Sequence, residues 1–252
     1  METKTFSASF AEEKNPEYPI SFTREELDAV LNDPEHTTAD ILSFFEKDFP
    51  ELFAYPVVVS AGKEYSLRKH TEMVMGQFEK YFKKKNFPCG MSSDFFEVIL
   101  ALHDIGKPEA IEKTGDKERQ HEYTEKIMRS ILPKLGYGEQ EISLATALIA
   151  EDSIGGYLQY GDENSAENIA GIAKNHGLEK NDFLELLTVL FCVDAGGYTK
   201  DAGGSEKSST NSLFAFNPEK GEMSLSPEIK KRYDLLVKKV REINEVSEKG
   251  GE

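Results

Sequence analysis

One stretch of the sequence decides the fold: Phe95-Phe96-Glu97-Val98-Ile99-Leu100-Ala101-Leu102-His103-Asp104-Ile105-Gly106-Lys107-Pro108. It predicts a helix with apolar residues on every side, which should run through the core and not along its surface. Asp94 can cap the first turn of this helix, and Gly106 with Pro108 should end it. A carboxylate at the end of a buried helix must be paired, hydrogen-bonded or bound to a metal. Unless the helix simply emerges at the surface there, His103 and Asp104 are where we expect the chemistry.

The 252-residue chain has 30 Lys and Arg residues against 46 Asp and Glu residues, a formal net charge of −16. This charge repels phosphate backbones, so long nucleic acids are not expected as partners. A small phosphorylated substrate is compatible, because a metal or a few basic side chains can reverse the potential inside one pocket. Cys89 and Cys192 suggest no disulfide framework. The sequence shows no signal peptide or membrane-spanning run, so we expect a cytoplasmic protein, although an exported protein with another kind of signal would look the same.

The predicted fold class is all-α, a single helical bundle with N-terminal and C-terminal helical extensions. Residues 1–20 predict a flexible arm, residues 21–64 a helical extension, and residues 65–200 the main helical domain. Residues 201–225 are rich in Gly and Ser and predict a long loop, which is either a lid over a site or a disordered insertion. Residues 226–252 predict a C-terminal helix that packs on the same domain.

His70 is the first candidate for a buried ligand. Ser66 begins a helix whose apolar stripe includes Leu67, Val74 and Phe78, and His70 lies on that stripe at helical spacing. Its side chain should therefore face inward. A single inward histidine is more often a satisfied core residue than a ligand, so this candidate needs support from other residues.

Asp194 repeats the pattern of Asp104, because it ends an apolar helix on a stripe shared with Phe183, Leu187 and Leu190. An aspartate placed at the end of a buried helical stripe requires a counter-charge or a metal in the same way.

Three further candidates come from the two helices after the central one. A charged loop at 109–120 is expected to precede a helix whose inward face starts with His121. The following helix, about 139–152, ends in Glu151 and Asp152, and one of these acids should point inward. Each of the three also has an ordinary explanation as a polar residue at a helix end.

Four helices thus offer His70, the pair His103-Asp104, His121 and Asp194. Imidazole nitrogens and carboxylate oxygens are the ligands that a divalent first-row metal prefers, and the lack of a cysteine cluster argues against a structural zinc site. Adjacent residues on a straight helix point about 100° apart. A looser helix near Gly106 would let His103 and Asp104 reach one ion.

His70, His103-Asp104 and Asp194, together with Ile105-Gly106-Lys107 after the pair, resemble the HD-domain superfamily of metal-dependent phosphohydrolases. The resemblance covers about residues 66–199. It implies an all-helical HD-like domain, here residues 65–200, in which His70, His103, Asp104 and Asp194 hold a divalent manganese, magnesium, iron, cobalt, nickel or zinc ion. It also implies hydrolysis of phosphomonoesters or phosphodiesters, often of nucleotides.

The resemblance leaves the number of ions open, at one or two. Binuclear members are similar to this chain at His121, but they usually place further histidines where this chain has Glu151 and Asp152. These residues could bind a second ion, or one of them could serve as general acid for the leaving group. Lys107 could contact the substrate phosphate as a point charge, and Arg119 is a weaker candidate for the same role.

The expected function is hydrolysis of a phosphate ester or anhydride on a small, nucleotide-like molecule by a metal-activated water. Two alternatives stay open. One is a di-iron oxygenase on the same scaffold, with a site completed by His121 and Asp152. The other is a non-catalytic module that binds a nucleotide or a partner.

Overall fold

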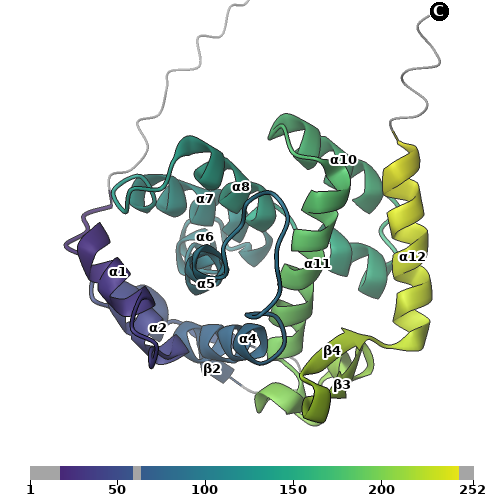
Figure 1. Ribbon diagram of the computed structural model, residues 1–252, viewed down its shortest axis with the longest axis horizontal. Helices are drawn as coiled ribbons and strands as arrows, with labels where there is room; N and C mark the ends of the chain where they lie inside the picture. The colour runs from purple at the N-terminus through teal and green to yellow at the C-terminus, as the bar shows by residue number, and fades with distance from the viewer. Residues whose placement is uncertain (1–17, 59–63, 244–252) are drawn as a thin grey trace, which may run out of the picture.

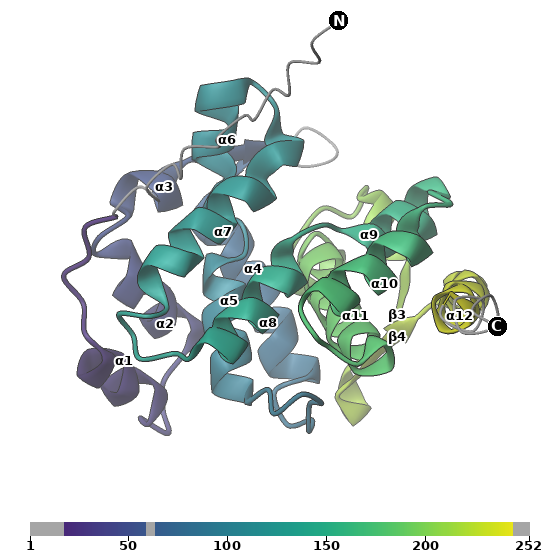
Figure 2. The same cartoon turned by 90° about the horizontal axis from the view of Figure 1, so that it is seen from above.

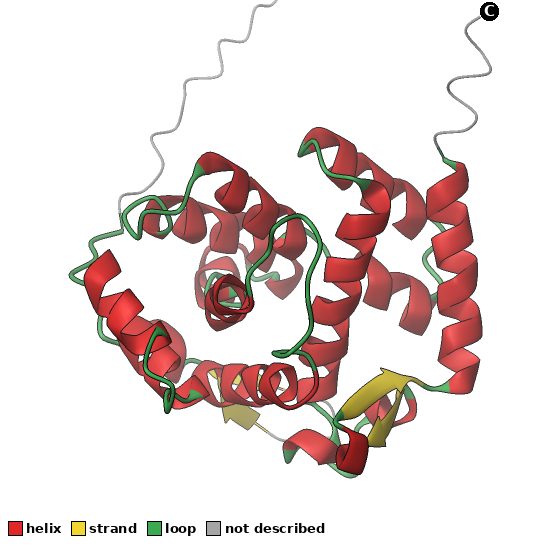
Figure 3. Ribbon diagram, in the orientation of Figure 1, coloured by secondary structure: helices red, strands yellow, loops and turns green. Residues whose placement is uncertain are grey.

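The computed structural model describes residues 18–58 and 64–243 of the chain. Within them the prediction of an all-α protein is confirmed, because helices form most of the molecule and the strands make only two short antiparallel pairs (Figure 3). Most of the predicted arm at 1–20, and the end of the predicted segment 226–252, lie outside the described residues. No helix of the described part is long and apolar enough to cross a membrane.

The predicted central helix is α5, Ser93–Leu102, and Figure 1 looks almost along its axis, with other helices around it. Every side chain from 95 to 102 is buried, including that of Glu97. Full burial of one large apolar side chain contributes about 1.5–3 kcal/mol relative to exposure, so this helix organises the core. The residue that caps its first turn is Ser92, whose side chain accepts a backbone hydrogen bond, and not Asp94 as predicted.

The helices that enclose α5 come from both halves of the chain. They are α1 (Arg24–Leu31), α2 (Thr38–Glu46), α4 (Leu67–Tyr81), α7 (Gln120–Ile131), α8 (Glu139–Ile149) and α11 (Lys180–Gly197). Helix α4 is capped by Ser66, as predicted, and its predicted stripe of Leu67, His70, Val74 and Phe78 is buried. The prediction that His70 faces the core is therefore confirmed.

Two further helices, α10 (Ser165–Asn175) and α12 (Pro227–Glu242), lie outside this ring. Figure 2 shows α12 at one edge of the molecule, beyond the β3–β4 hairpin. Leu236 and Val240 of α12 are nevertheless fully buried in the same hydrophobic core as α5. The remaining short helices are α3 (Pro50–Ala54), α6 (Lys107–Thr114) and α9 (Ser153–Gly155), and a π-helical turn spans Gly156–Tyr160.

The predicted charged loop at 109–120 is wrong over most of its length. The structure has α6 there, followed by a 3₁₀ turn at Lys117–Arg119. Pro108 was predicted to help end the central helix, but it occupies the first turn of α6, where proline is tolerated because the backbone N–H has no helical partner. The chain therefore stops one helix and begins another within a few residues.

The predicted loop at 201–225 contains an antiparallel hairpin of β3 (Phe214–Asn217) and β4 (Glu222–Leu225), besides 3₁₀ turns. Phe214 and Met223 are buried, so the hairpin packs against the helical body. A second pair joins β1 (Pro56–Val58) to β2 (Glu64–Ser66), in a segment too short to predict a sheet. Both strand pairs are small additions at the outside of a core that is built from helices.

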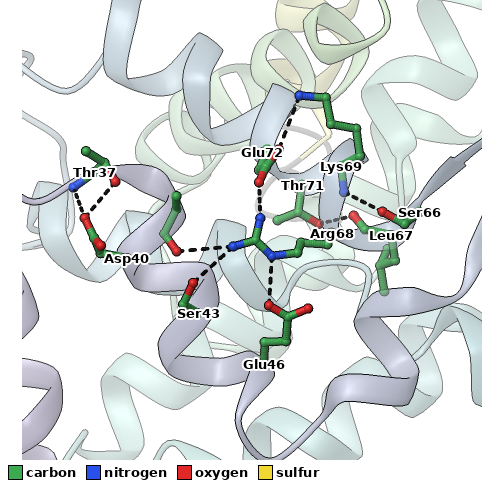
Figure 4. Close-up of polar contacts among 11 residues, drawn as sticks. Thr37, Asp40, Ser43, Glu46, Ser66, Leu67, Arg68, Lys69, Thr71 and Glu72 are labelled. Atoms are coloured by element: carbon green, nitrogen blue, oxygen red, sulfur yellow. Dashed lines mark hydrogen bonds and ion pairs between the residues drawn. The ribbon is translucent and has the colours of Figure 1, made fainter.

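A polar network fixes the start of α4, the helix that carries His70 (Figure 4). The Arg68 guanidinium bonds Glu46 Oε2 of α2 at 2.8 Å and Ser43 Oγ of α2 at 3.1 Å, and it pairs with Glu72 on its own helix. A guanidinium held from several directions loses little freedom for each bond formed. The network therefore sets how α4 lies against α2.

Candidate metal centre

Three side chains from different parts of the chain meet at the end of α5. His70 comes from α4, His103 from the residue that caps α5, and Asp194 from α11. One atom from each lies within 4.8 Å of the others, a spacing that could hold a metal ion. Asp194 Oδ1 lies 3.1 Å from His70 Nε2 and 3.6 Å from His103 Nε2. Asp194 was predicted to end its helix, but α11 continues for three more residues.

Asp104 faces the same two histidines. Its Oδ2 lies 3.4 Å from His70 Nε2 and 3.7 Å from His103 Nε2. The predicted loosening of the helix near Gly106 is a full break, because α5 ends at Leu102 and the chain turns before α6 begins. This turn lets two adjacent residues face one point. The structure thus brings all four predicted ligands together.

His103 directs one ring nitrogen to this centre. Its Nδ1 lies 2.7 Å from the Leu100 carbonyl oxygen, which can only accept a hydrogen bond, so Nδ1 carries the hydrogen. In the neutral ring Nε2 then presents its lone pair toward Asp104 and Asp194. Donation from the other ring nitrogen to a carbonyl is how metal-ligating histidines are commonly oriented.

The converging atoms do not satisfy one another. Among the described residues, His103 Nε2 and Asp194 Oδ1 are buried without a hydrogen-bond partner, so the short separations above are charge contacts without hydrogen-bond alignment. An unsatisfied buried polar atom costs roughly 1–3 kcal/mol. A divalent cation would satisfy both atoms at once, and two imidazoles with carboxylate oxygens suit a first-row ion. The residues present therefore fit a metal.

Neighbouring side chains favour the ionised form of both carboxylates. Burial would raise the pKa of Asp194, but His103 and His70 outweigh it and hold that pKa well below its usual value. Burial likewise opposes ionisation of Asp104, and Lys107 with His103 lowers its pKa well below the usual range. Lys107 Nζ lies 2.5 Å from Asp104 Oδ2, and this ion pair raises the pKa of Lys107 against the effect of burial.

Tyr198 belongs to this centre, although sequence reasoning did not identify it. Its ring stacks on His70 with centroids 4.5 Å apart and planes 17° apart, and its hydroxyl lies 3.3 Å from His70 Nε2. Burial raises the pKa of Tyr198 well above its usual value, and Asp194 and Asp104 add to the shift, so the hydroxyl stays protonated. The available signal was spacing, since Tyr198 follows Asp194 by four residues and therefore shares its helix face.

Two glycines allow the backbones to approach at this centre. A Cβ at Gly197 would lie 2.9 Å from Val74 Cγ2 and 3.2 Å from Val74 N, so α4 and α11 could not pack as they do with a larger residue there. A Cβ at Gly106 would collide with the backbone of Thr124 on α7. The first contact sets the approach of His70 to Asp194, and the second holds the turn after α5 against α7.

A cavity of about 80 Å³ opens beside the centre. Its polar lining is His103, Asp104, Gln120, Glu151, Asp152 and Asp194, and its apolar lining includes Leu148, Ile149, Leu187, Leu190 and Phe191. Within the part of the chain that the structure describes, no Lys or Arg lines this cavity. Gln120 was not predicted, and its Oε1 is buried without a partner among the described residues.

Glu151 and Asp152 both reach this cavity, where only one of them was expected to face inward. Asp152 caps α9 by accepting the Gly155 N–H at 2.8 Å, and burial raises the pKa of Asp152 to about 6. Both oxygens of Glu151 accept from Asn168 Nδ2 at 3.1 Å. Both residues are exposed overall, so their carboxylates also remain accessible to water.

His121 and Arg119 are not brought to the centre. His121 Nδ1 donates to the Glu118 carbonyl oxygen at 3.0 Å, and the neighbouring Gln120 lines the cavity instead. The residue of α7 that reaches the cavity is therefore Gln120, one position before the predicted His121. Arg119 pairs with Glu122 at 2.6 Å, and its side chain is 50% exposed. Lys107 does not line the cavity either, and its amine is engaged by Asp104.

Comparisons of the chain with models of known families, with curated proteins and with solved structures found no match.

Proposed function

We propose that this protein is a metal-dependent hydrolase that cleaves a phosphate ester or anhydride of a small molecule. The observation that carries the proposal is the convergence of His70, His103 and Asp194 on one point, where His103 Nε2 and Asp194 Oδ1 have no partner. Asp104 faces the same point, and a cavity open to substrate adjoins it. The resemblance to HD-domain phosphohydrolases rests on these same residues.

The side chains have distinct roles in this proposal. His70, His103, Asp104 and Asp194 would hold the divalent ion, which when bound lowers the pKa of a water and offsets phosphoryl charge. Lys107, which does not line the cavity, keeps Asp104 ionised and oriented through their ion pair. Tyr198 fixes the plane of the His70 ring. Asp152, with its pKa of about 6, is placed in the cavity to give a proton to a leaving group.

Two observations support one ion rather than two in this proposal. Within residues 18–58 and 64–243, the group that could hold a metal contains His70, His103 and Asp194. His121, which a second ion or a di-iron oxygenase site would need, does not line the cavity. We therefore propose hydrolysis with a single ion and put the oxygenase second.

Elemental analysis of the purified protein tests the proposal first. We expect close to one divalent ion per chain after supplementation, and release of phosphate or nitrophenol from a generic phosphomonoester or phosphodiester. Asp194→Asn should lose the ion and the activity while keeping its helical circular dichroism. Glu167→Gln, an exposed charge removal on α10, is the matched control and should keep both.

Two results would contradict this assignment. Full hydrolytic activity in Asp194→Asn would place the reaction elsewhere in the molecule. Two irons per chain with oxygen consumption and no hydrolysis would replace the hydrolase with the oxygenase.

A further inference from the structure

Gln120 lines the cavity beside the metal centre, and its carboxamide makes no hydrogen bond to another described residue. Its Oε1 is buried and has no partner among those residues. A buried amide oxygen without a partner is unfavourable for folding, because it has lost water and gained no donor. The carboxamide therefore contributes no hydrogen bond to the stability of the fold, and its presence at the cavity needs another explanation.

The backbone of Gln120 lies against the turn that follows the ligand pair His103-Asp104. A Cβ at Gly106 would lie 2.8 Å from the Gln120 carbonyl oxygen and 2.2 Å from Thr124 N, so the two backbones are in direct contact. The Gly106 N–H also donates to Thr124 Oγ1 at 3.0 Å. Gln120 is the first residue of α7, so these contacts hold the start of that helix beside the ligand-bearing turn. Three of the four proposed ligands line the same cavity.

The side chains around this cavity offer many acceptors and few donors. Its polar lining residues other than His103 and Gln120 are carboxylates, which only accept hydrogen bonds when ionised. The His103 ring has its hydrogen on Nδ1, where the Leu100 carbonyl oxygen accepts it. Asp152, when protonated, serves the leaving group in the proposed reaction. Among the lining side chains within residues 18–58 and 64–243, the uncommitted N–H donors are therefore those of Gln120.

A phosphoryl group needs such donors. Its oxygens carry negative charge and accept hydrogen bonds, and in water they are fully hydrated. Inside the cavity, an oxygen that does not contact the metal would face carboxylates of like charge. A lysine or arginine at this position would be drawn into ion pairs with those carboxylates. A carboxamide is neutral, so its N–H groups stay available for the substrate.

Given the hydrolytic function proposed for this centre, we propose that Gln120 is a substrate-binding residue whose Nε2 donates a hydrogen bond to a phosphoryl oxygen of the ester. The carboxamide is unpaired in the free protein, and its hydrogen bond forms when the ester binds. The same contact is present in the bound ester and in the transition state, so it acts mainly on binding.

The test compares two variants of Gln120 with the wild type. Gln120→Met keeps the length of the side chain and removes the donor, whereas Gln120→Glu keeps the shape and replaces the donor with a negative charge. Phenylphosphonate has phosphoryl oxygens but a P–C bond that this reaction does not cleave, so its calorimetric Kd for the manganese-loaded protein is measured. We expect binding to be about ten- to hundredfold weaker in Gln120→Met, and weaker still in Gln120→Glu.

Hydrolysis of a nitrophenyl phosphate ester gives the kinetic counterpart. The loss of kcat/KM in Gln120→Met should match the loss of phenylphosphonate binding, and it should come mainly from a higher KM. Gln140→Met is the matched control, because Gln140 is exposed on α8 and does not line this cavity. It should keep the wild-type Kd and kcat/KM.

The metal-free protein separates substrate binding from a structural role. Gln120→Met should have an equal or higher melting temperature than the wild type, since it removes the unpartnered Oε1, and its affinity for manganese should be unchanged. Wild-type Kd and kcat/KM in Gln120→Met, or a lower melting temperature together with weaker manganese binding, would overturn the inference. Failure of the wild-type protein to bind phenylphosphonate would also overturn it. Weaker phenylphosphonate binding in both Gln120 variants, without hydrolysis of any ester by the wild type, would support the inference and refute the proposed hydrolysis.

Discussion

Substitution of Lys107 by methionine tests the electrostatic account of the metal centre most directly. The ammonium lies 2.5 Å from Asp104 Oδ2, and both side chains are largely buried, at 11% and 5% exposed. Removal of one member of a buried ion pair costs about 3–5 kcal/mol, because the other charge is left uncompensated. Asp104 retains its contacts with His70 and His103, so we expect Lys107→Met to lower the free energy of unfolding by about 2–3 kcal/mol.

Urea denaturation in the presence of a chelator measures this loss, which corresponds to a melting temperature lower by about 4–12 °C. Saturating manganese should recover part of it, because the ion supplies a second counter-charge to Asp104. Lys113→Met is the matched control on the same helix, since Lys113 is 55% exposed and its pairing with Glu109 should contribute less than about 1 kcal/mol. A loss below about 0.5 kcal/mol for Lys107→Met would refute the reasoning.

The remaining predictions concern backbone packing, pH dependence and the metal itself. Gly197→Ala should lower the free energy of unfolding by about 1–3 kcal/mol and weaken manganese binding in calorimetry, because the added Cβ would meet Val74. The control is Gly171→Ala, where an added Cβ meets nothing within 4 Å, and this variant should be as stable as the wild type or more stable. Burial would raise the pKa of Asp201, but hydrogen bonds from α4 outweigh this effect and lower that pKa. The ionised carboxylate therefore stabilises the fold at pH values above the pKa of Asp201 in the unfolded chain, about 3.9. This stabilisation is lost as the pH falls through the lower pKa of Asp201 in the folded protein. Asp201→Asn should therefore cost about 1–2 kcal/mol at pH 7 in urea denaturation, and a difference from wild type that fails to shrink below about pH 4 would contradict the assignment. His103→Gln should abolish the visible spectrum of the cobalt-substituted protein without loss of helical circular dichroism, and an unaltered spectrum would exclude His103 as a ligand.

The central helix and the four candidate ligands could be identified from the sequence, because burial on all sides leaves an unmistakable apolar run. His103 and Asp104 follow such a run directly, and His70 and Asp194 each lie on an apolar stripe with helical spacing. For these residues, local pattern and tertiary position agree. The nature of the metal, the substrate and the HD-like relationship stay predictions.

The parts that could not be predicted depend on contacts between distant segments. Gln120 replaces His121 at the cavity because the segment before α7 is a helix and a 3₁₀ turn, not a loop, and this fixes where α7 begins. The β3–β4 hairpin is stabilised by packing of Met223 beside Gly196, which the polar composition of its segment does not reveal. Proline at 108 illustrates the same limit, since it suits both the end of one helix and the first turn of the next.

His70 and Asp194 meet where α4 packs against α11, and this has a consequence for the synthesis of the chain. These ligands lie far apart in the chain, so the ribosome must complete α11 before the centre can exist. A nascent chain that has already folded α4 and α5 would present His70, His103 and Asp104 without their fourth partner. Loading with metal is therefore expected to follow release or late synthesis, and a chain truncated before α11 should emerge without a functional centre. A metal held by all four residues would then be retained only by chains that contain α11.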